Sequence, residues 1–425
     1  MSTQATPTPS PVQLVTHESL AQAVSDVVSS MPVVDMHTHL FPAQLADLNC
    51  WGIDEILTYH YLIAEFFRST TIAENEFYKL PKAAQADAVW ETLFVRNTPL
   101  SEATRGVVTI FHALGLDPSA PDLTEARSFF AGLDPEEHLQ NVLESAGVKQ
   151  IVMTNDPFDA KERAHWESGA FKDSRFRPAL RIDTLLLNFK GAAPSLRAWG
   201  FHLSEQLTDS TIKEVRRFLK FWVEKMQPAY MAVSLPPEFT YPDKTSTAVN
   251  LLINAALPIC SEYNLPLSLM IGVRRQVNPQ LRLAGDSVGC GGVDNLERLC
   301  ADFPSNRFLV TMLARENQHS LCVAARKFRN LMPFGCWWFL NTMSMVREIT
   351  TMRLELLGPS FIAQHSDARV LEQLLYKWPH SRTAIADALT NSYLNLTKLG
   401  TVLPREQIER DVYRLLEGNF AEWSK

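Results

Sequence analysis

The sequence has few cysteines and no long apolar run, and each shortage excludes a class of protein. Six cysteines are scattered through 425 residues without a CxxC pair, so we expect free thiols in a reducing, cytoplasmic compartment. No apolar run approaches the roughly 20 residues that a membrane span needs. The first 15 residues are polar and lack the apolar core of a signal peptide. We predict a disordered tail over residues 1–15 and a cytoplasmic protein without a membrane partner.

Charge of one sign is not concentrated anywhere in the sequence. The formal net charge is -7, and neither acidic nor basic residues form a long run. This pattern argues against nucleic acid as the main partner. Hydrophobic residues make up 46% of the chain and charged residues 20%, a composition typical of a globular protein with an ample core.

Short apolar segments rich in β-branched residues recur along the chain, with helical patterns between several of them. Most are continuous rather than alternating, as in strands that are covered on both faces. About eight repeats of strand and helix predict a (β/α)8 TIM barrel. A doubly wound sheet is the structural alternative, but the sequence lacks the Gly-rich phosphate turn that it would need. The expected strands are residues 32–37, 150–156, 177–183, 230–235, 266–272, 307–313, 331–337 and 360–367.

One connection is far longer than the others. About 100 residues, rich in helix formers, separate the first two expected strands, and a bare loop of that length is uncommon. We predict a helical insertion over residues 45–147, on the carboxyl-terminal face of the barrel where substrates bind. Residues 16–425 would then form a single barrel domain.

The carboxyl ends of the expected strands carry residues that can bind a metal. His37 and His39 end the first strand, and alternation sends both side chains to the same face. Asp367 ends the last strand, which neighbours the first in a closed barrel. Two imidazoles and one carboxylate can bind a divalent ion and leave positions open for water or substrate. Zinc is the expected ion, with iron(II) and manganese as alternatives.

Arginines follow several of the same strands. Any one of Arg181, Arg315 and Arg369 could form a structural ion pair, but three at one barrel mouth indicate an anionic ligand. A guanidinium holds a carboxylate through two parallel hydrogen bonds, which a lysine cannot do. Trp337 is expected in the pocket wall. The strand ends also carry Asp156, Asp183, Arg274 and Arg275.

Motifs that run in order through residues 30–385 resemble those of the uronate isomerases, a branch of the amidohydrolase superfamily. VVDMHTHLFP resembles the family's D-x-H-x-H-L-x-P opening, PFGCWWFLN resembles F-G-x-x-W-W-F-N-D, and IAQHSDAR resembles the T-D-S-R end motif. Met270 stands where the family usually has a histidine on the fifth strand. The resemblance implies His37, His39 and Asp367 as metal ligands and places His60, Tyr61, Arg181, Arg315 and Arg369 around a sugar acid.

Three functions are compatible with these residues. The first is aldose–ketose isomerisation of a hexuronate or a related sugar acid, with Asp367, Tyr61 and His60 as candidates for moving the proton between C2 and C1. The second is metal-dependent hydrolysis of an acidic substrate. The third is a non-catalytic barrel that binds a sugar acid. We predict the isomerase, with a small-molecule sugar acid as its partner, and the sequence is compatible with a homo-oligomer.

Overall fold

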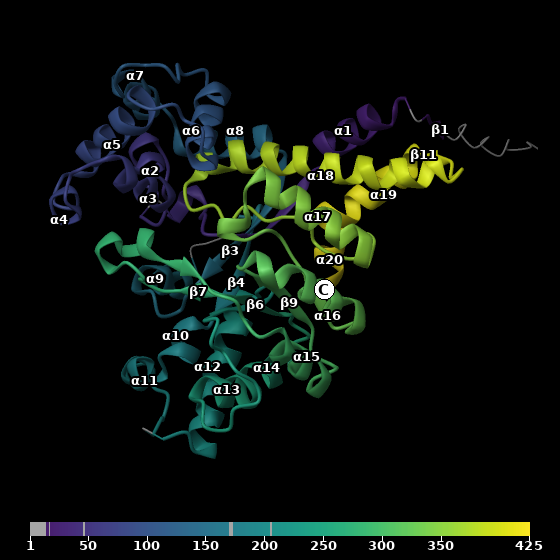
Figure 1. Cartoon of the computed structure of the whole chain (residues 1–425). Helices are drawn as coiled ribbons and strands as arrows, with labels where there is room; N and C mark the ends of the chain where they lie inside the picture. The colour runs from purple at the N-terminus through teal and green to yellow at the C-terminus, as the bar shows by residue number, and fades with distance from the viewer. Residues whose placement is uncertain (1–13, 17, 46, 170–172, 205) are drawn as a thin grey trace, which may run out of the picture.

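Parallel strands form one curled sheet at the centre of the molecule (Figure 1). The structure is a computed structural model that describes residues 14–16, 18–45, 47–169, 173–204 and 206–425. The strand order is β10-β9-β6-β5-β4-β3-β2. Each strand runs parallel to its neighbours in this order. The strands are β2 (Val33–Thr38), β3 (Val148–Asn155), β4 (Phe176–Arg181), β5 (Met231–Leu235), β6 (Leu267–Ile271), β9 (Phe308–Met312) and β10 (Leu331–Pro333).

The strands are covered on both faces, as their continuous apolar sequences predict. Every residue of β2, β6 and β9 is buried. Helices connect successive strands along the chain, which confirms the α/β class. They are α9 (Ala160–Ser168), α10 (Asp183–Leu187), α11 (Phe189–Ala198), α12 (Asp209–Met226), α13 (Thr247–Leu251), α14 (Leu257–Glu262), α15 (Val293–Asp302), α16 (Gln318–Lys327) and α17 (Met343–Leu357).

The eighth expected strand, residues 360–367, is reduced to one isolated parallel bridge between Phe334 and Ile362. The segment still closes the barrel, because the backbone N–H of Asp367 donates to the carbonyl of His37 over 3.1 Å. Asp367 has a φ of 50°, in the left-handed region that interrupts an extended strand. The chain is therefore a TIM barrel whose closing strand is irregular.

The long connection between β2 and β3 is helical. In Figure 1, α2 to α7 form a lobe at one end of the molecule. The last helix, α8, instead packs against β3 and α18, so the final part of the predicted 45–147 segment lies on the barrel. The helices are α2 (Ile53–Leu57), α3 (His60–Ser69), α4 (Glu74–Phe77), α5 (Lys82–Trp90), α6 (Glu102–Ala113), α7 (Thr124–Ala131) and α8 (Pro135–Ala146).

The first described residues pair with a segment that precedes the last helices of the chain. Of the predicted tail, residues 1–13 lie outside the described residues, whereas Leu14–Val15 form β1 and pair with β11 (Leu403–Pro404). The tail prediction is therefore wrong for these two residues, because backbone pairing holds them. Among the described helices, none is both long and apolar enough to cross a membrane. The remaining helices are α1 (Leu20–Ser30), α18 (Leu374–Lys398), α19 (Arg405–Tyr413) and α20 (Asn419–Trp423).

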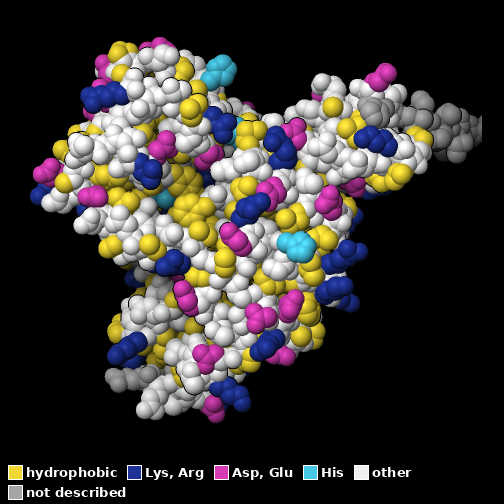
Figure 2. Space-filling model, viewed as in Figure 1, with side chains coloured by type: hydrophobic (Ala, Val, Ile, Leu, Met, Phe, Trp, Pro, Cys, Tyr) yellow, Lys and Arg dark blue, Asp and Glu magenta, His cyan; other side chains and the backbone are white. Residues whose placement is uncertain are grey.

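A hairpin of β7 (Val273–Arg274) and β8 (Ser287–Val288) follows β6 and carries the short helix η4 (Pro279–Gly285). This helix contacts α3 and α4 of the lobe, and the Tyr78 hydroxyl donates to the Leu281 carbonyl over 2.8 Å. The lobe and the hairpin therefore meet over the carboxyl ends of the strands. On the face shown in Figure 2, hydrophobic side chains gather where the lobe meets the rest of the molecule, and charges of both signs are interspersed.

Candidate active site

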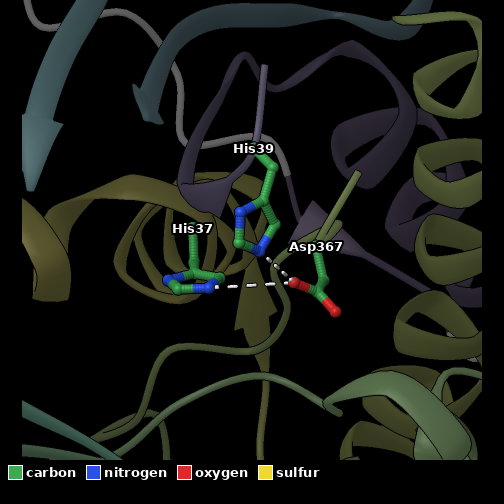
Figure 3. A group of neighbouring side chains, drawn as sticks. All are labelled: His37, His39 and Asp367. Carbon is green, nitrogen blue, oxygen red and sulfur yellow. Dashed lines mark ion pairs between the residues drawn. The ribbon is translucent and has the colours of Figure 1, made fainter. Parts of the chain in front are cut away.

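His37, His39 and Asp367 converge at the carboxyl end of β2 (Figure 3). One potential ligand atom from each residue lies within 4.8 Å of the others. The Nε2 atoms of His37 and His39 lie 3.7 and 3.4 Å from the same atom, Oδ1 of Asp367. Barrel closure therefore brings together the three predicted ligands, two from the first strand and one from the last segment.

A hydrogen bond on the far side of the His37 ring determines which nitrogen carries the proton. The Tyr230 hydroxyl donates to the Met36 carbonyl over 2.7 Å and lies 3.0 Å from His37 Nδ1. Because its one hydrogen is used, the hydroxyl oxygen can only accept from an Nδ1–H. The Nε2 atom of His37 is left with a free lone pair that faces Asp367.

The same arrangement recurs at His39. The Thr154 hydroxyl donates to the Thr38 carbonyl over 3.0 Å and lies 2.9 Å from His39 Nδ1. His39 Nε2 is therefore also unprotonated and also faces Asp367. Two lone pairs directed at one carboxylate oxygen would repel it, unless a cation lies between them. This donor set fits a divalent metal ion, whose histidine ligands usually donate their other N–H in this way.

The protonation states of the three residues agree with this arrangement. Burial lowers the pKa of both His37 and His39 to about 3, so both rings are neutral at neutral pH, as metal binding requires. Burial alone would raise the pKa of Asp367, but favourable interactions outweigh burial and lower that pKa. Among them is that with Arg369, which stays charged when both rings are neutral. Asp367 is therefore an ionised carboxylate.

Two of the three predicted arginines reach this site. Arg181 and Arg369 line the same cavity as the three ligand residues. Burial opposes the charge of Arg181, but Asp183, 3.3 Å away, outweighs it and raises the arginine's pKa. Asp183 is itself fixed by the backbone N–H of Ser234 at 3.1 Å. The cavity thus combines a metal-ligand set with fixed positive charge.

The structure does not bring Arg315 to the site. Its Nε donates to Glu348 over 2.9 Å, and 59% of its side chain is exposed. Arg275 lines the cavity instead, and its Nη1 donates to Asp286 over 2.6 Å. Arg275 follows an expected strand, as Arg315 does, but its approach to the cavity depends on the β7–β8 hairpin, which the sequence pattern did not predict.

His60 and Tyr61 begin α3 and lie beside Trp338. Ring centroids are 5.2 Å apart for His60 and Trp338, and 6.3 Å apart for Tyr61 and Trp338. The His60 Nε2, the Tyr61 hydroxyl and the Trp338 Nε1 are buried without a hydrogen-bond partner. Unsatisfied buried polar atoms are costly, so a cluster of them indicates a ligand. The predicted Trp337 is buried and lines the cavity with the metal-ligand residues.

Cavities of different sizes meet at these residues. The cavity that reaches the metal-ligand residues has a volume of about 30 Å³, which is room for about two waters. Cavities of about 310 and 250 Å³ are both lined by His60, the first also by Arg369 and the second by Trp338. A cavity of about 730 Å³ between α1, α8 and α18 contains none of the predicted site residues, so volume alone does not locate the site.

Among solved structures, the chain is similar to a uronate isomerase from Bacillus halodurans, with 47% sequence identity, a TM-score of 0.95 and 97% of each chain covered. The chain belongs to the uronate isomerase family. Two more distant structures share its fold, a uronate isomerase from Thermotoga maritima (15% identity, TM-score 0.75, 97% of this chain and 98% of that one) and a glucuronate isomerase from Caulobacter crescentus (14%, 0.77, 98% and 95%). No family model and no curated protein matches the chain.

Family membership confirms the resemblance that the motifs indicated, and with it the isomerase class. Met270 lines the cavity beside the ligand residues, at the position where the resemblance to the family predicts a histidine. A thioether is a poor ligand for zinc, iron(II) or manganese. His37, His39 and Asp367 are therefore the set that the described residues offer to an ion.

Proposed function

We propose that this protein interconverts the aldose and ketose forms of a hexuronate, with one divalent metal ion held by His37, His39 and Asp367. The proposal depends chiefly on two imidazole lone pairs aimed at one carboxylate oxygen beside Arg181 and Arg369. This arrangement suits a cation and an anionic substrate in the same cavity. The name of the 47% identical relative, a uronate isomerase, supports the same substrate class.

The metal ion would polarise substrate oxygens and offset the negative charge that develops during proton transfer. Zinc is the proposed ion, with iron(II) and manganese as alternatives. Measuring the metal content of the purified protein identifies it.

Arginine side chains would bind the substrate's carboxylate. Arg181, Arg275 and Arg369 line the metal-ligand cavity, and a guanidinium forms two parallel hydrogen bonds with a carboxylate. Binding at that end places the reacting carbons at a defined point. Because this cavity holds about two waters, it cannot contain both the reacting carbons and the carboxylate, so the six-carbon chain would extend into the adjoining cavities. Arg369 also lines one of these, and His60 and Tyr61 line the other. The unpartnered polar atoms of His60 and Tyr61 would then bind substrate hydroxyls.

Asp367 and Tyr61 have complementary protonation states for the reaction. Asp367 is ionised, and only one of its oxygens faces the histidines, while the other points away from them (Figure 3). We assign this second oxygen to accept the C2 proton and return it to C1. Burial raises the pKa of Tyr61 well above its ordinary value, so its hydroxyl stays protonated and can donate.

The second proton of the reaction moves between oxygens. The hydroxyl proton on O2 of the aldose must reach O1, and together with the C2-to-C1 transfer this conserves all atoms. Tyr61 and His60 are the proposed relay. Burial lowers the pKa of His60 to about 3, so this ring takes part as a neutral hydrogen-bonding group.

Product NMR in D2O tests the proposal. The protein, loaded in turn with Zn²⁺, Mn²⁺ and Fe²⁺, is incubated with D-glucuronate or D-galacturonate. We expect a ketose of unchanged composition apart from deuterium that exchanges during proton transfer. No conversion of any hexuronate in a wider screen would contradict the proposal. Hydrolysis of an acidic ester or lactone, which adds the elements of water, would favour the hydrolase alternative.

We further propose a cytoplasmic location, because all six cysteines are free thiols. The homo-oligomer also stays a prediction, which light scattering during size-exclusion chromatography checks.

A further inference from the structure

Buried charged side chains hold the turn that carries Asp367. Its left-handed φ of 50° is unfavourable for a residue with a side chain and persists only where the surroundings enforce it. Asp35 of β2 accepts the backbone N–H of Ser366 at 3.0 Å. Lys377 of α18 donates from Nζ to the carbonyl of Ser366 at 2.7 Å. The backbone N–H and the backbone carbonyl of Ser366 are thus held by side chains from two different elements, β2 and α18.

The carbonyl that Lys377 contacts belongs to the peptide bond between Ser366 and Asp367. The N–H of that same peptide donates to the His37 carbonyl at 3.1 Å. The plane of this peptide is therefore fixed at both ends, by Lys377 on one side and by β2 on the other. The peptide plane in turn determines the direction in which the Asp367 side chain leaves the backbone.

Burying the amino group of Lys377 lowers the stability of the folded protein. The exposed fraction of Lys377 is 2%, and among the described residues it forms no ion pair within 4 Å. Burial lowers its pKa, while the carboxylates of Asp367, Glu102 and Asp35 oppose that shift from further away. A buried amine without a contacting carboxylate costs stability that an apolar side chain would not. Packing alone therefore gives no reason for a lysine here.

The amino group of Lys377 also lies near Tyr61. Its Nζ lies 5.7 Å from the centroid of the Tyr61 ring, within the range of a cation–π interaction. One side chain therefore touches both the turn of the proposed metal ligand and the proposed proton donor.

We propose that Lys377 is a positioning residue, whose amino group orients the Ser366–Asp367 peptide and thereby aims the Asp367 carboxylate at the metal. Lys377 is not among the residues that line the metal-ligand cavity. This inference rests on the proposed metal centre, and it is tested without substrate so that it can fail independently of the isomerase activity.

The test is the Zn²⁺ affinity of the metal-free protein, measured by competition with a chromogenic chelator. Lys377→Met removes the amine and keeps a side chain of similar length. We expect its Zn²⁺ dissociation constant to rise by about 10- to 100-fold, the usual effect of losing a residue that orients a ligand. Lys377→Gln keeps a hydrogen-bond donor and should lie between Met and the wild type. Lys398→Met, on an exposed site of the same helix, is the matched control and should bind Zn²⁺ as the wild type does.

Circular dichroism and thermal unfolding of the metal-free proteins separate positioning from a structural role. A structural role would lower the melting temperature and leave the affinity of the folded protein unchanged. Zn²⁺ affinity within about threefold of the wild type in folded Lys377→Met, against the loss expected for an orienting residue, would overturn the inference. If Lys377→Met does not fold, the same criterion applies to Lys377→Gln. If a hexuronate is converted, kcat at saturating Zn²⁺ should fall more than KM rises.

Discussion

The residues proposed to bind the metal and those proposed to bind the substrate differ in how many of their polar atoms have hydrogen-bond partners within the protein. In the metal-ligand group, His37, His39 and Asp367, each ring has a fixed hydrogen-bond partner on its far side. In the substrate wall, formed by His60, Tyr61 and Trp338, buried polar atoms have no partner. The first group is arranged before any ligand arrives. The second is completed only when a ligand supplies the missing hydrogen bonds.

The location of the two groups in the fold explains the difference. The metal-ligand group lies on β2 and on the segment that closes the barrel, where backbone hydrogen bonds between neighbouring segments fix its geometry. The substrate wall lies on α3 and on the short helix η6 (Trp338–Leu340) that follows β10. Of these, α3 packs against η4 of the hairpin. A rigid barrel can hold a metal site, while the surrounding segments can vary to suit a substrate.

The largest expected effect is on the metal-ligand group. His37→Ala removes one of three ligands, so metal binding should be lost and turnover of a hexuronate should fall by about 10³-fold or more. Metal analysis and product NMR on the same sample measure both. Wild-type turnover by the metal-free variant would contradict the assignment.

Arg369→Ala tests the anion-binding side of the cavity. Losing charged hydrogen bonds worth about 3 kcal/mol should reduce kcat/KM by about 10²-fold. Arg315→Ala is the matched control, because Arg315 pairs with Glu348 on the surface, and it should leave kcat/KM nearly unchanged. A larger loss for Arg315→Ala than for Arg369→Ala would show that the substrate binds elsewhere.

Tyr61→Phe removes only a hydroxyl from the substrate wall. Turnover should fall by about 10²-fold if this hydroxyl moves or donates a proton. Stability should not fall, because the hydroxyl has no hydrogen-bond partner to lose. Steady-state kinetics and chemical denaturation provide the two readouts, and a stability loss without a kinetic effect would assign Tyr61 to the core.

Tyr230→Phe makes the same chemical change behind the metal-ligand group. It removes the acceptor for His37 Nδ1–H, so metal affinity should weaken by about tenfold or more. Chelator competition measures this, with Tyr61→Phe as the matched control that should retain wild-type affinity. Equal affinities in the two variants would remove the distinction between the two groups.

The smallest effect concerns pH. His60 has a pKa lowered by burial to about 3, so between that value and about 6.5 the unfolded chain binds more protons than the folded one. Its contribution to stability is therefore complete above pH 6.5 and is lost as the pH falls, by about 1.4 kcal/mol at pH 5.5. Urea unfolding of the metal-free protein at pH 7.5 and 5.5 should show a smaller decrease for His60→Asn than for the wild type. Equal decreases would mean that His60 is not held neutral by the fold.

Most of the barrel could be predicted from the sequence. Continuous apolar runs such as residues 266–272 correspond to real strands, here β6, because a strand buried on both faces has no polar side. The exception is residues 360–367, where apolar composition predicts a strand but the left-handed conformation of Asp367 interrupts it. That conformation depends on contacts with distant segments, which local composition does not contain.

Part of the candidate site could also be predicted, because the barrel fixes where the strands end. Arg181 and Arg369 follow strand positions, and the barrel directs such residues to one cavity. Arg315 also follows a strand, yet it turns to Glu348 on α17. Arg275 enters the cavity only because the β7–β8 hairpin that it belongs to folds back toward the barrel. Long side chains beyond a strand end are placed by their neighbours and not by the strand.

The spacing of His37 and His39 along the chain is enough to place both side chains on one face, because residues two apart along a strand point the same way. The spacing and apolar character of the strands likewise predict the barrel class. The remaining features of the site depend on contacts that form on folding. Tyr230, 193 positions from His37 in the chain, sets that ring's protonation, and closure of the barrel brings Asp367 to both imidazoles. Such contacts join segments remote in sequence, so they exist only once the chain has folded.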